Sequence, residues 1–122
     1  MGDQNQPDGT EQGVVVHLDD ADPGKHAAVM RNVTNLIDAL GAGTVVELVT
    51  HGAGVDALLA GGPNEQAVRD LLGKGVQVSA CANTMRSKQI GEDALVPGAR
   101  VVPSGVAQVV VRQREGWSYV RP

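Results

Sequence analysis

One cysteine carries the most distinctive chemistry in this sequence. Cys81 is the only cysteine among the 122 residues, and it stands between the alternating run VQVSA and the pair Asn83 and Thr84, which favour helix starts. A thiol just before a helix loses its proton more easily, because the N–H groups that open the helix stabilise a thiolate. Free cysteines are also among the most buried residue types. Cys81 is therefore interpreted either as a reactive thiolate or as a small apolar residue that fills a gap.

Polar residues and glycines follow the other predicted strands in the same way. The carboxyl ends of parallel strands meet at one edge of a sheet, where ligands bind, so we expect these residues to form one rim with Cys81. The residues expected on this rim, besides Asn83 and Thr84, are Asp19, Asp20, His51, Gly52, Ser104 and Gly105.

Two rim residues have specific interpretations. His51 could act as a base for the thiol, or it could be a loop histidine without a chemical role, since a base must lie within hydrogen-bond reach of its partner. Ser104 lacks the GxSxG motif of a hydrolase nucleophile and is expected to cap a helix.

No metal ion or cofactor is expected from the sequence. Asp19, Asp20 and Asp22 lack the ligand spacing of a calcium loop, and turn or cap roles explain them better. The single cysteine has no CxxC partner for zinc, and no glycine motif for a nucleotide follows a predicted strand. His17 is expected to be a hydrogen-bonded core histidine, and His26 is expected to be solvated.

The strands and helices that should position this rim are predicted from the spacing of apolar residues. Short β-branched runs predict strands, and apolar residues three and four apart predict helices. The predicted strands are 13–18, 44–50, 76–80, 100–102 and 117–120. Five helices are predicted: from the Asp22 cap and Pro23 to Gly41, over 55–60, from Pro63 to Gly73, over 83–91, and from the Ser104 cap to Gly116. In the last of these helices, Val106, Val109, Val110 and Gln113 lie on one side.

Strands that alternate with helices indicate βαβ units. The sequence therefore predicts an α/β fold with a mostly parallel sheet of five strands and helices on both faces. Residues 1–12 are polar and aperiodic and are expected to be a flexible tail, so residues 13–122 are expected to form a single domain.

Composition excludes several classes of function. The net charge is −4 and the cations do not cluster, so no nucleic-acid partner is expected. No apolar run reaches the roughly 20 residues of a membrane span, and the start lacks a signal-peptide pattern, so a cytoplasmic protein is expected. Trp117 and Tyr119 are the only aromatic residues, so small side chains must build the core and oligomer contacts are plausible.

Five stretches together resemble the DsrE/DsrF-like family of small sulfur-relay proteins over residues 13–122. They are VVVHLDD, RNVTNLIDALG, VELVTHGAGVDALL, KGVQVSACANTM and VVPSGVAQVVVRQREGWSYVRP. The chain is most similar to the stand-alone branch of the family with a CxNTM loop. The resemblance implies a three-layer α/β/α sandwich of flavodoxin-like architecture and a homotrimer or homohexamer. The chain differs from the relay subunits in the stretch ANTMRSKQIG, and it has His51 where many relatives have an aromatic residue.

The resemblance also implies a function. Relay members carry sulfur as a persulfide on a cysteine at this strand end, and Cys81 is the matching residue. The leading hypothesis is thus a cytoplasmic sulfur carrier, with possible sulfurtransferase-like activity, that exchanges sulfur with donor and acceptor proteins. Asn83 and Thr84 would shape the helix start, and Asp19, His51 and Ser104 would line the rim. The alternative is a non-catalytic oligomeric module that binds a small ligand or a protein at the same rim.

Overall fold

Five parallel strands form one sheet in the order β4-β3-β2-β1-β5. This sheet is seen in a computed structural model that describes residues 13–122, so the tail expected at 1–12 lies outside the described residues. The strands are β1 (Gly13–Leu18), β2 (Val45–Thr50), β3 (Gln77–Cys81), β4 (Arg100–Val102) and β5 (Ser118–Val120).

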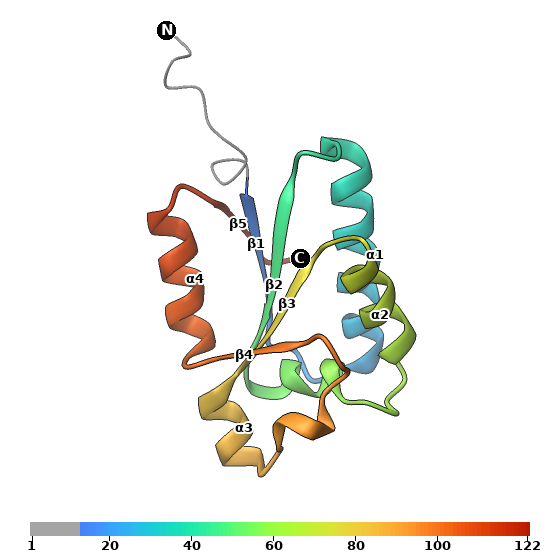
Figure 1. The fold of residues 1–122 in the computed structure, drawn as a ribbon, viewed down its shortest axis with the longest axis vertical. Coiled ribbons are helices and arrows are strands. Elements are labelled where there is room, and N and C mark those ends of the chain that lie inside the picture. Colours follow the sequence, from blue (N-terminus) through green and yellow to red (C-terminus); the bar gives the residue numbers. More distant parts are fainter. Residues whose placement is uncertain (1–12) are drawn as a thin grey trace, which may run out of the picture.

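Helices cover both faces of the sheet (Figure 1). The first two, α1 (Pro23–Leu40) and α2 (Glu65–Gly73), lie on one face, and α4 (Gly105–Arg114) lies alone on the other. Because β1 to β4 follow one another in a single direction, their right-handed connections put α1 and α2 on the same face. The connection through α4 returns from β4 to β5 at the far edge and therefore crosses the opposite face. The predicted three-layer α/β/α architecture is confirmed.

Three short elements gather at the carboxyl end of the sheet, the lower end in Figure 1. They are α3 (Ala82–Lys88) and the 3₁₀ helices η2 (Gly52–Leu58) and η3 (Glu92–Ala94). The helix predicted at 55–60 thus begins at Gly52, and the third strand extends to Cys81. The helix predicted to close at Gly91 ends earlier, because Gln89 takes a left-handed backbone conformation with φ 56°.

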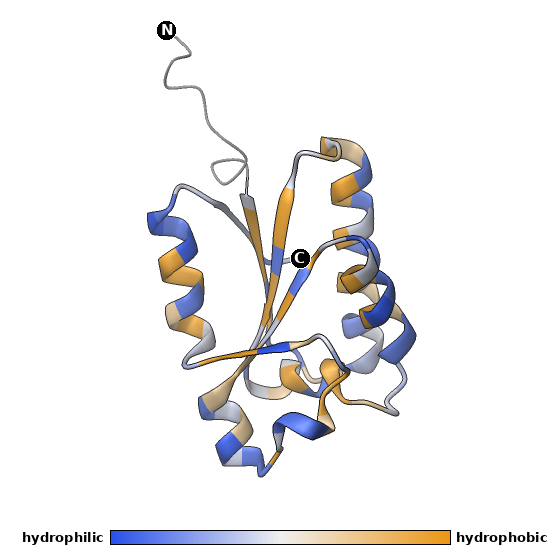
Figure 2. Cartoon of the chain, viewed as in Figure 1, coloured by the Kyte–Doolittle hydropathy of each residue, from blue (hydrophilic) through white to orange (hydrophobic). Residues whose placement is uncertain are grey.

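The main apolar core lies between the sheet and the α1 and α2 helices. Alternate side chains of each strand point into it, such as Val14, Val16 and Leu18 of β1. Figure 2 shows the resulting apolar stretches along the strands. The opposite face, under α4, has a much smaller core, made of Val15, Val49, Val109 and Trp117. The strand residues whose side chains point to this opposite face therefore include polar ones, and several of these belong to the candidate site.

One sequence expectation about side-chain burial is wrong, and the orientation of α4 was not specified by the sequence. His26 is buried, because its Nε2 donates to the Asp20 carbonyl oxygen at 2.6 Å in the turn before α1. In α4, Val109 faces the sheet, but Val106 and Val110 point outward. Arg112 takes the inner face instead, because it pairs with a buried carboxylate on β2. Among residues 13–122, no helix has the length and apolar character that crossing a membrane requires.

Candidate functional site

Cys81 lies where β3 ends and α3 begins. It is the last residue of β3 and the N-cap of α3, so the extended backbone turns into a helix directly after the thiol. Its side chain shares the α4 face of the sheet with Ser79, two residues earlier. Only 5% of Cys81 is exposed to solvent. The position at a strand end agrees with a reactive thiol, and the low exposure agrees with a packed apolar residue, so both interpretations of Cys81 stay open at this point.

The surroundings of the thiol favour its charged form. Burial by itself raises the pKa of Cys81, but hydrogen bonds outweigh this effect and lower it below the ordinary value. The donors are the backbone N–H of Gly105, the backbone N–H and hydroxyl of Thr84, and the backbone N–H of Asn83. The side-chain oxygen of Asn83 accepts a hydrogen bond from Arg86 instead. The hydrogen bonds thus favour the thiolate, which is the nucleophilic form of cysteine.

Gly105 brings the start of α4 against the two central strands. A β-carbon added at Gly105 would lie 2.9 Å from His51 Cβ and 3.3 Å from Cys81 Cβ. These two side chains therefore flank the same glycine, on neighbouring strand ends. Ser104 fixes this helix start as predicted, because its hydroxyl oxygen accepts the Ala107 N–H at 3.2 Å.

A chain of hydrogen bonds runs from His51 across the sheet. His51 Nδ1 and His17 Nε2 are 2.9 Å apart, and their rings stack with centroids 4.8 Å apart. The other ring nitrogen of His17, Nδ1, is 2.8 Å from the Tyr119 hydroxyl on β5. Burial, followed by the neighbouring His51, lowers the pKa of His17 and favours its neutral form. His17 is hydrogen-bonded as predicted, but it is half-buried and faces the rim rather than the core.

Asp19 joins the two histidines from the loop after β1. One ligand atom each of His17, Asp19 and His51 lies within 4.8 Å of the other two. Asp19 Oδ1 also pairs with Arg121 Nη2 at 2.9 Å. These three side chains are the ones at the site that could hold a metal ion.

A buried polar network between α4 and the sheet holds α4 in place next to the site. Glu47 is completely buried in the middle of β2, where its carboxylate accepts from Arg112 Nε at 2.7 Å, Ser79 Oγ at 2.6 Å and Gln108 Nε2 at 2.9 Å. The Arg112 guanidinium lies 4.2 Å from the centre of the Trp117 ring. This network ties α4 to β2 and β3 and so fixes where Gly105 meets the thiol.

The structure brings most of the predicted rim residues together. Cys81, Thr84, Gly105 and His51 form the centre, and Gly52 reaches it because its N–H donates to Thr84 Oγ1 at 2.8 Å. Asp19 lies with His17, whereas Ser104 acts only through its cap.

Sequence reasoning missed other polar residues of this region. The sequence predicts no site role for Tyr119 or the buried Glu47, and it predicts a core position for His17, which instead faces the rim. The charged residue inside the apolar run VVELVT was the available signal for Glu47.

The fold and the site define a small α/β protein with a hydrogen-bonded cysteine at the carboxyl edge of a parallel sheet. The DsrE/DsrF-like family model matches residues 14–122, and the chain belongs to this family. Among curated proteins, none matches the chain.

Three solved structures share the fold. The protein of unknown function MTH1491 from Methanobacterium thermoautotrophicum is 38% identical, with a TM-score of 0.86 over 90% of this chain and 98% of its own. The ychN protein from E. coli is 18% identical, with a TM-score of 0.77 over 91% of this chain and 99% of its own. The conserved protein of unknown function BT1422 from Bacteroides thetaiotaomicron is 10% identical, with a TM-score of 0.77 over 96% and 100%. The last two show the fold alone.

Proposed function

We propose that this protein carries sulfur as a persulfide on Cys81. The observation that carries the proposal is the set of hydrogen bonds at the thiol, which come from backbone N–H groups of two separate segments and from one hydroxyl. Together they favour the thiolate, the form that attacks a sulfur donor. Membership of the DsrE/DsrF-like family supports the same role, because the resemblance described from the sequence implies a sulfur-carrying cysteine at this strand end.

The proposed transfer needs two displacement steps. First, the Cys81 thiolate attacks the outer sulfur of a persulfide donor; a new sulfur–sulfur bond forms, the donor's sulfur–sulfur bond breaks, and the donor leaves as a thiolate with the electron pair. Second, an acceptor thiolate attacks the outer sulfur on Cys81, and the Cys81 thiolate leaves. The outer sulfur is passed on without a net change in oxidation, so no cofactor takes part. A lowered thiol pKa helps the second step most, since a more stable thiolate leaves faster.

The proposed donors and acceptors are proteins or small molecules that bear persulfides and thiols. An unpaired cysteine is typical of a reducing compartment, and the proposed compartment is the cytoplasm. Thr84 and Asn83 hold the thiolate in this proposal, and the N-terminal end of α4 closes the site through Gly105.

Intact mass spectrometry tests the carrier function directly. The protein, without an affinity tag, is incubated with glutathione persulfide and then desalted. Wild type is expected to gain the mass of one sulfur atom and to lose it again on addition of a thiol acceptor. A Cys81→Ser variant is the control, since the chain has no other thiol. A wild-type protein that never gains sulfur contradicts the proposal.

The burial of Cys81 favours a second candidate function. With 5% of the residue exposed, the thiol could be a packed part of a rim that binds a small ligand or a protein without chemistry. This alternative expects slow alkylation and an apparent thiol pKa at or above the free value of about 8.5. The carrier hypothesis predicts that alkylation begins at lower pH, so the pH dependence of alkylation distinguishes a sulfur carrier from a binding module.

A further inference from the structure

Two histidines and a carboxylate form a second cluster beside the thiol. His17 lies near the end of β1, Asp19 follows that strand, and His51 directly follows the neighbouring β2. One ligand atom of each side chain lies within 4.8 Å of the other two. We propose that His17, Asp19 and His51 bind a divalent first-row transition-metal ion. This proposal does not depend on the persulfide carrier, because Cys81 is not one of the ligands.

The spacing of the ring nitrogens fits a shared metal. Two imidazole nitrogens bound at about 2.1 Å lie about 3.0 Å apart at right angles and about 3.4 Å apart in a tetrahedron. His17 Nε2 and His51 Nδ1 are 2.9 Å apart. The two rings therefore need to separate by only a few tenths of an ångström to admit the ion. The two rings are nearly parallel, with an interplanar angle of 15°.

Tyr119 prepares His17 to act as a ligand. Metal-binding histidines usually donate their second ring N–H to an oxygen, which fixes the tautomer and orients the ring. The Tyr119 hydroxyl oxygen lies 2.8 Å from His17 Nδ1 and can accept that proton. His17 Nε2 is then unprotonated and has a free lone pair, as a metal ligand requires.

Two carboxylates lie near the cluster. Asp19 and Asp20 favour the charged form of His17, whereas His51 and Arg121 disfavour it. Arg121 contacts Asp19 Oδ1 at 2.9 Å, which leaves the second carboxylate oxygen for a metal. All three ligands are half-buried, so an ion would be partly desolvated and open to a further ligand.

The donor set selects the kind of metal. Two imidazoles with one carboxylate suit Zn²⁺, Fe²⁺ or Ni²⁺, whereas Mg²⁺ and Ca²⁺ prefer oxygen ligands. Three protein ligands leave at least one position for water or a substrate. The sequence predicted no metal site because the two histidines are 34 residues apart and meet only through the pairing of β1 with β2.

Zinc titration tests the site with matched variants. The protein, free of a histidine tag, competes with a chromogenic chelator for Zn²⁺. Wild type is expected to bind one equivalent, and excess Mg²⁺ is expected not to displace it. His17→Gln, His51→Gln and Asp19→Asn should each weaken binding at least about tenfold. Asp20→Asn is the control, because it removes the same charge one residue away without removing a ligand.

Further measurements guard against misfolded variants and ions bound elsewhere. In wild-type protein, Zn²⁺ should shift the imidazole NMR signals of His17 and His51 but not those of the buried His26. Tyr119→Phe should weaken binding, and Cys81→Ser should leave it unchanged. The proposal is overturned if wild type binds no Zn²⁺, if the signals of His17 and His51 do not move, or if the Asp19 and Asp20 variants lose affinity equally.

Discussion

Thr84 connects the thiol of Cys81 to the loop after β2. Its oxygen accepts the Gly52 N–H at 2.8 Å, and its hydroxyl is one of the groups that lower the thiol pKa. A hydroxyl can accept and donate at once, so the Gly52 contact orients the Thr84 proton toward the sulfur. The backbone N–H groups at the site can be removed only by proline, which would also disturb the backbone. Thr84 is therefore the side chain through which the charge state of Cys81 can be tested.

Replacing Thr84 by Val should raise the pKa of Cys81 and slow its alkylation at neutral pH several-fold. The change removes a hydrogen bond that favours the thiolate but keeps the shape of the side chain. Iodoacetamide alkylation followed over pH measures the effect. The wild-type midpoint should lie below the free-thiol value of about 8.5, and the variant midpoint should lie above that of wild type.

Thr84→Ser is the matched control, since it keeps the hydroxyl and should alkylate like wild type. Identical pH profiles for Thr84→Val and wild type would show that the hydroxyl does not stabilise the thiolate.

Only part of the site could be predicted residue by residue. Cys81, Asn83 and Thr84 are neighbours in the chain, so a strand followed by a helix was enough to place them together. His17 and Tyr119 are 102 residues apart and meet because β1 pairs with β5. That pairing depends on the order of strands in the sheet, which the spacing of apolar residues does not specify.

The start of α4 is positioned by close packing against the ends of β2 and β3. We expect Gly105→Ala to lower the free energy of unfolding by about 1–3 kcal/mol, because an added methyl group in a packed interior forces its neighbours to move. Its β-carbon would lie 2.9 Å from His51 Cβ. Urea unfolding measures the change.

Gly73→Ala is the control for this substitution, because nothing lies within 4 Å of a β-carbon at the end of α2. It should be neutral or stabilising by about 0.5 kcal/mol. Equal effects of the two substitutions would contradict tight packing at Gly105.

The ion pair between Glu47 and Arg112 anchors the last turn of α4. We expect Arg112→Met to destabilise the protein by about 3 kcal/mol, because it leaves the fully buried Glu47 carboxylate without its cation. The combined Glu47→Gln and Arg112→Met variant should recover part of this loss, since a neutral amide needs no counter-ion. Chemical unfolding of the two single variants and the double variant gives the coupling between the residues.

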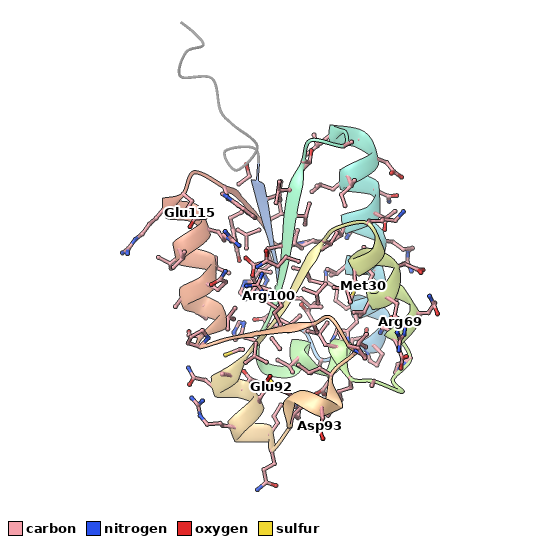
Figure 3. The ribbon with its side chains drawn as sticks, in the orientation of Figure 1. Met30, Arg69, Glu92, Asp93, Arg100 and Glu115 are labelled. Carbon is pink, nitrogen blue, oxygen red and sulfur yellow. The ribbon has the colours of Figure 1, made fainter. Side chains whose placement is uncertain are left out.

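An exposed pair on α2 supplies the comparison. Arg69 projects from α2 (Figure 3) and pairs with Glu65 at 2.8 Å, with 46% of the Arg69 side chain exposed. Arg69→Met should cost less than about 1 kcal/mol. If Arg112→Met costs no more than Arg69→Met, the pair does not anchor α4.

The elements themselves were largely predictable, but the orientation of α4 was not. Five strands, the Asp22 and Ser104 caps and the alternation of strands with helices follow from local patterns. The apolar pattern places Val106, Val109 and Val110 on one side of α4 but does not specify which side of the helix faces the sheet. The helix is rotated so that Gln108 and Arg112 meet Glu47, a buried charge that must be paired. A tertiary requirement on β2 thus overrides the apolar pattern of α4.

The rotation of α4 leaves an apolar strip on the outside of the whole molecule. Val106, Val110 and Val111 are 55%, 40% and 44% exposed. Figure 2 shows apolar and polar bands alternating along this helix. A surface helix normally turns its polar side to water, whereas α4 turns Gln108 and Arg112 toward the sheet and exposes three of its four valines. Such a strip is typical of a surface that contacts another protein chain.

We expect this strip to lie in the contact between copies of the chain, in the homotrimer or homohexamer that the resemblance to the family implies. Val110→Lys should then dissociate the oligomer, because a charge at the middle of an apolar contact is left without a partner. Leu40→Lys is the control, since Leu40 is a single exposed apolar residue at the end of α1, with 61% exposure. Sedimentation equilibrium should give the wild-type mass for the Leu40 variant and a smaller mass for the Val110 variant. A monomeric wild type, or an unchanged mass for the Val110 variant, would exclude α4 as the contact surface.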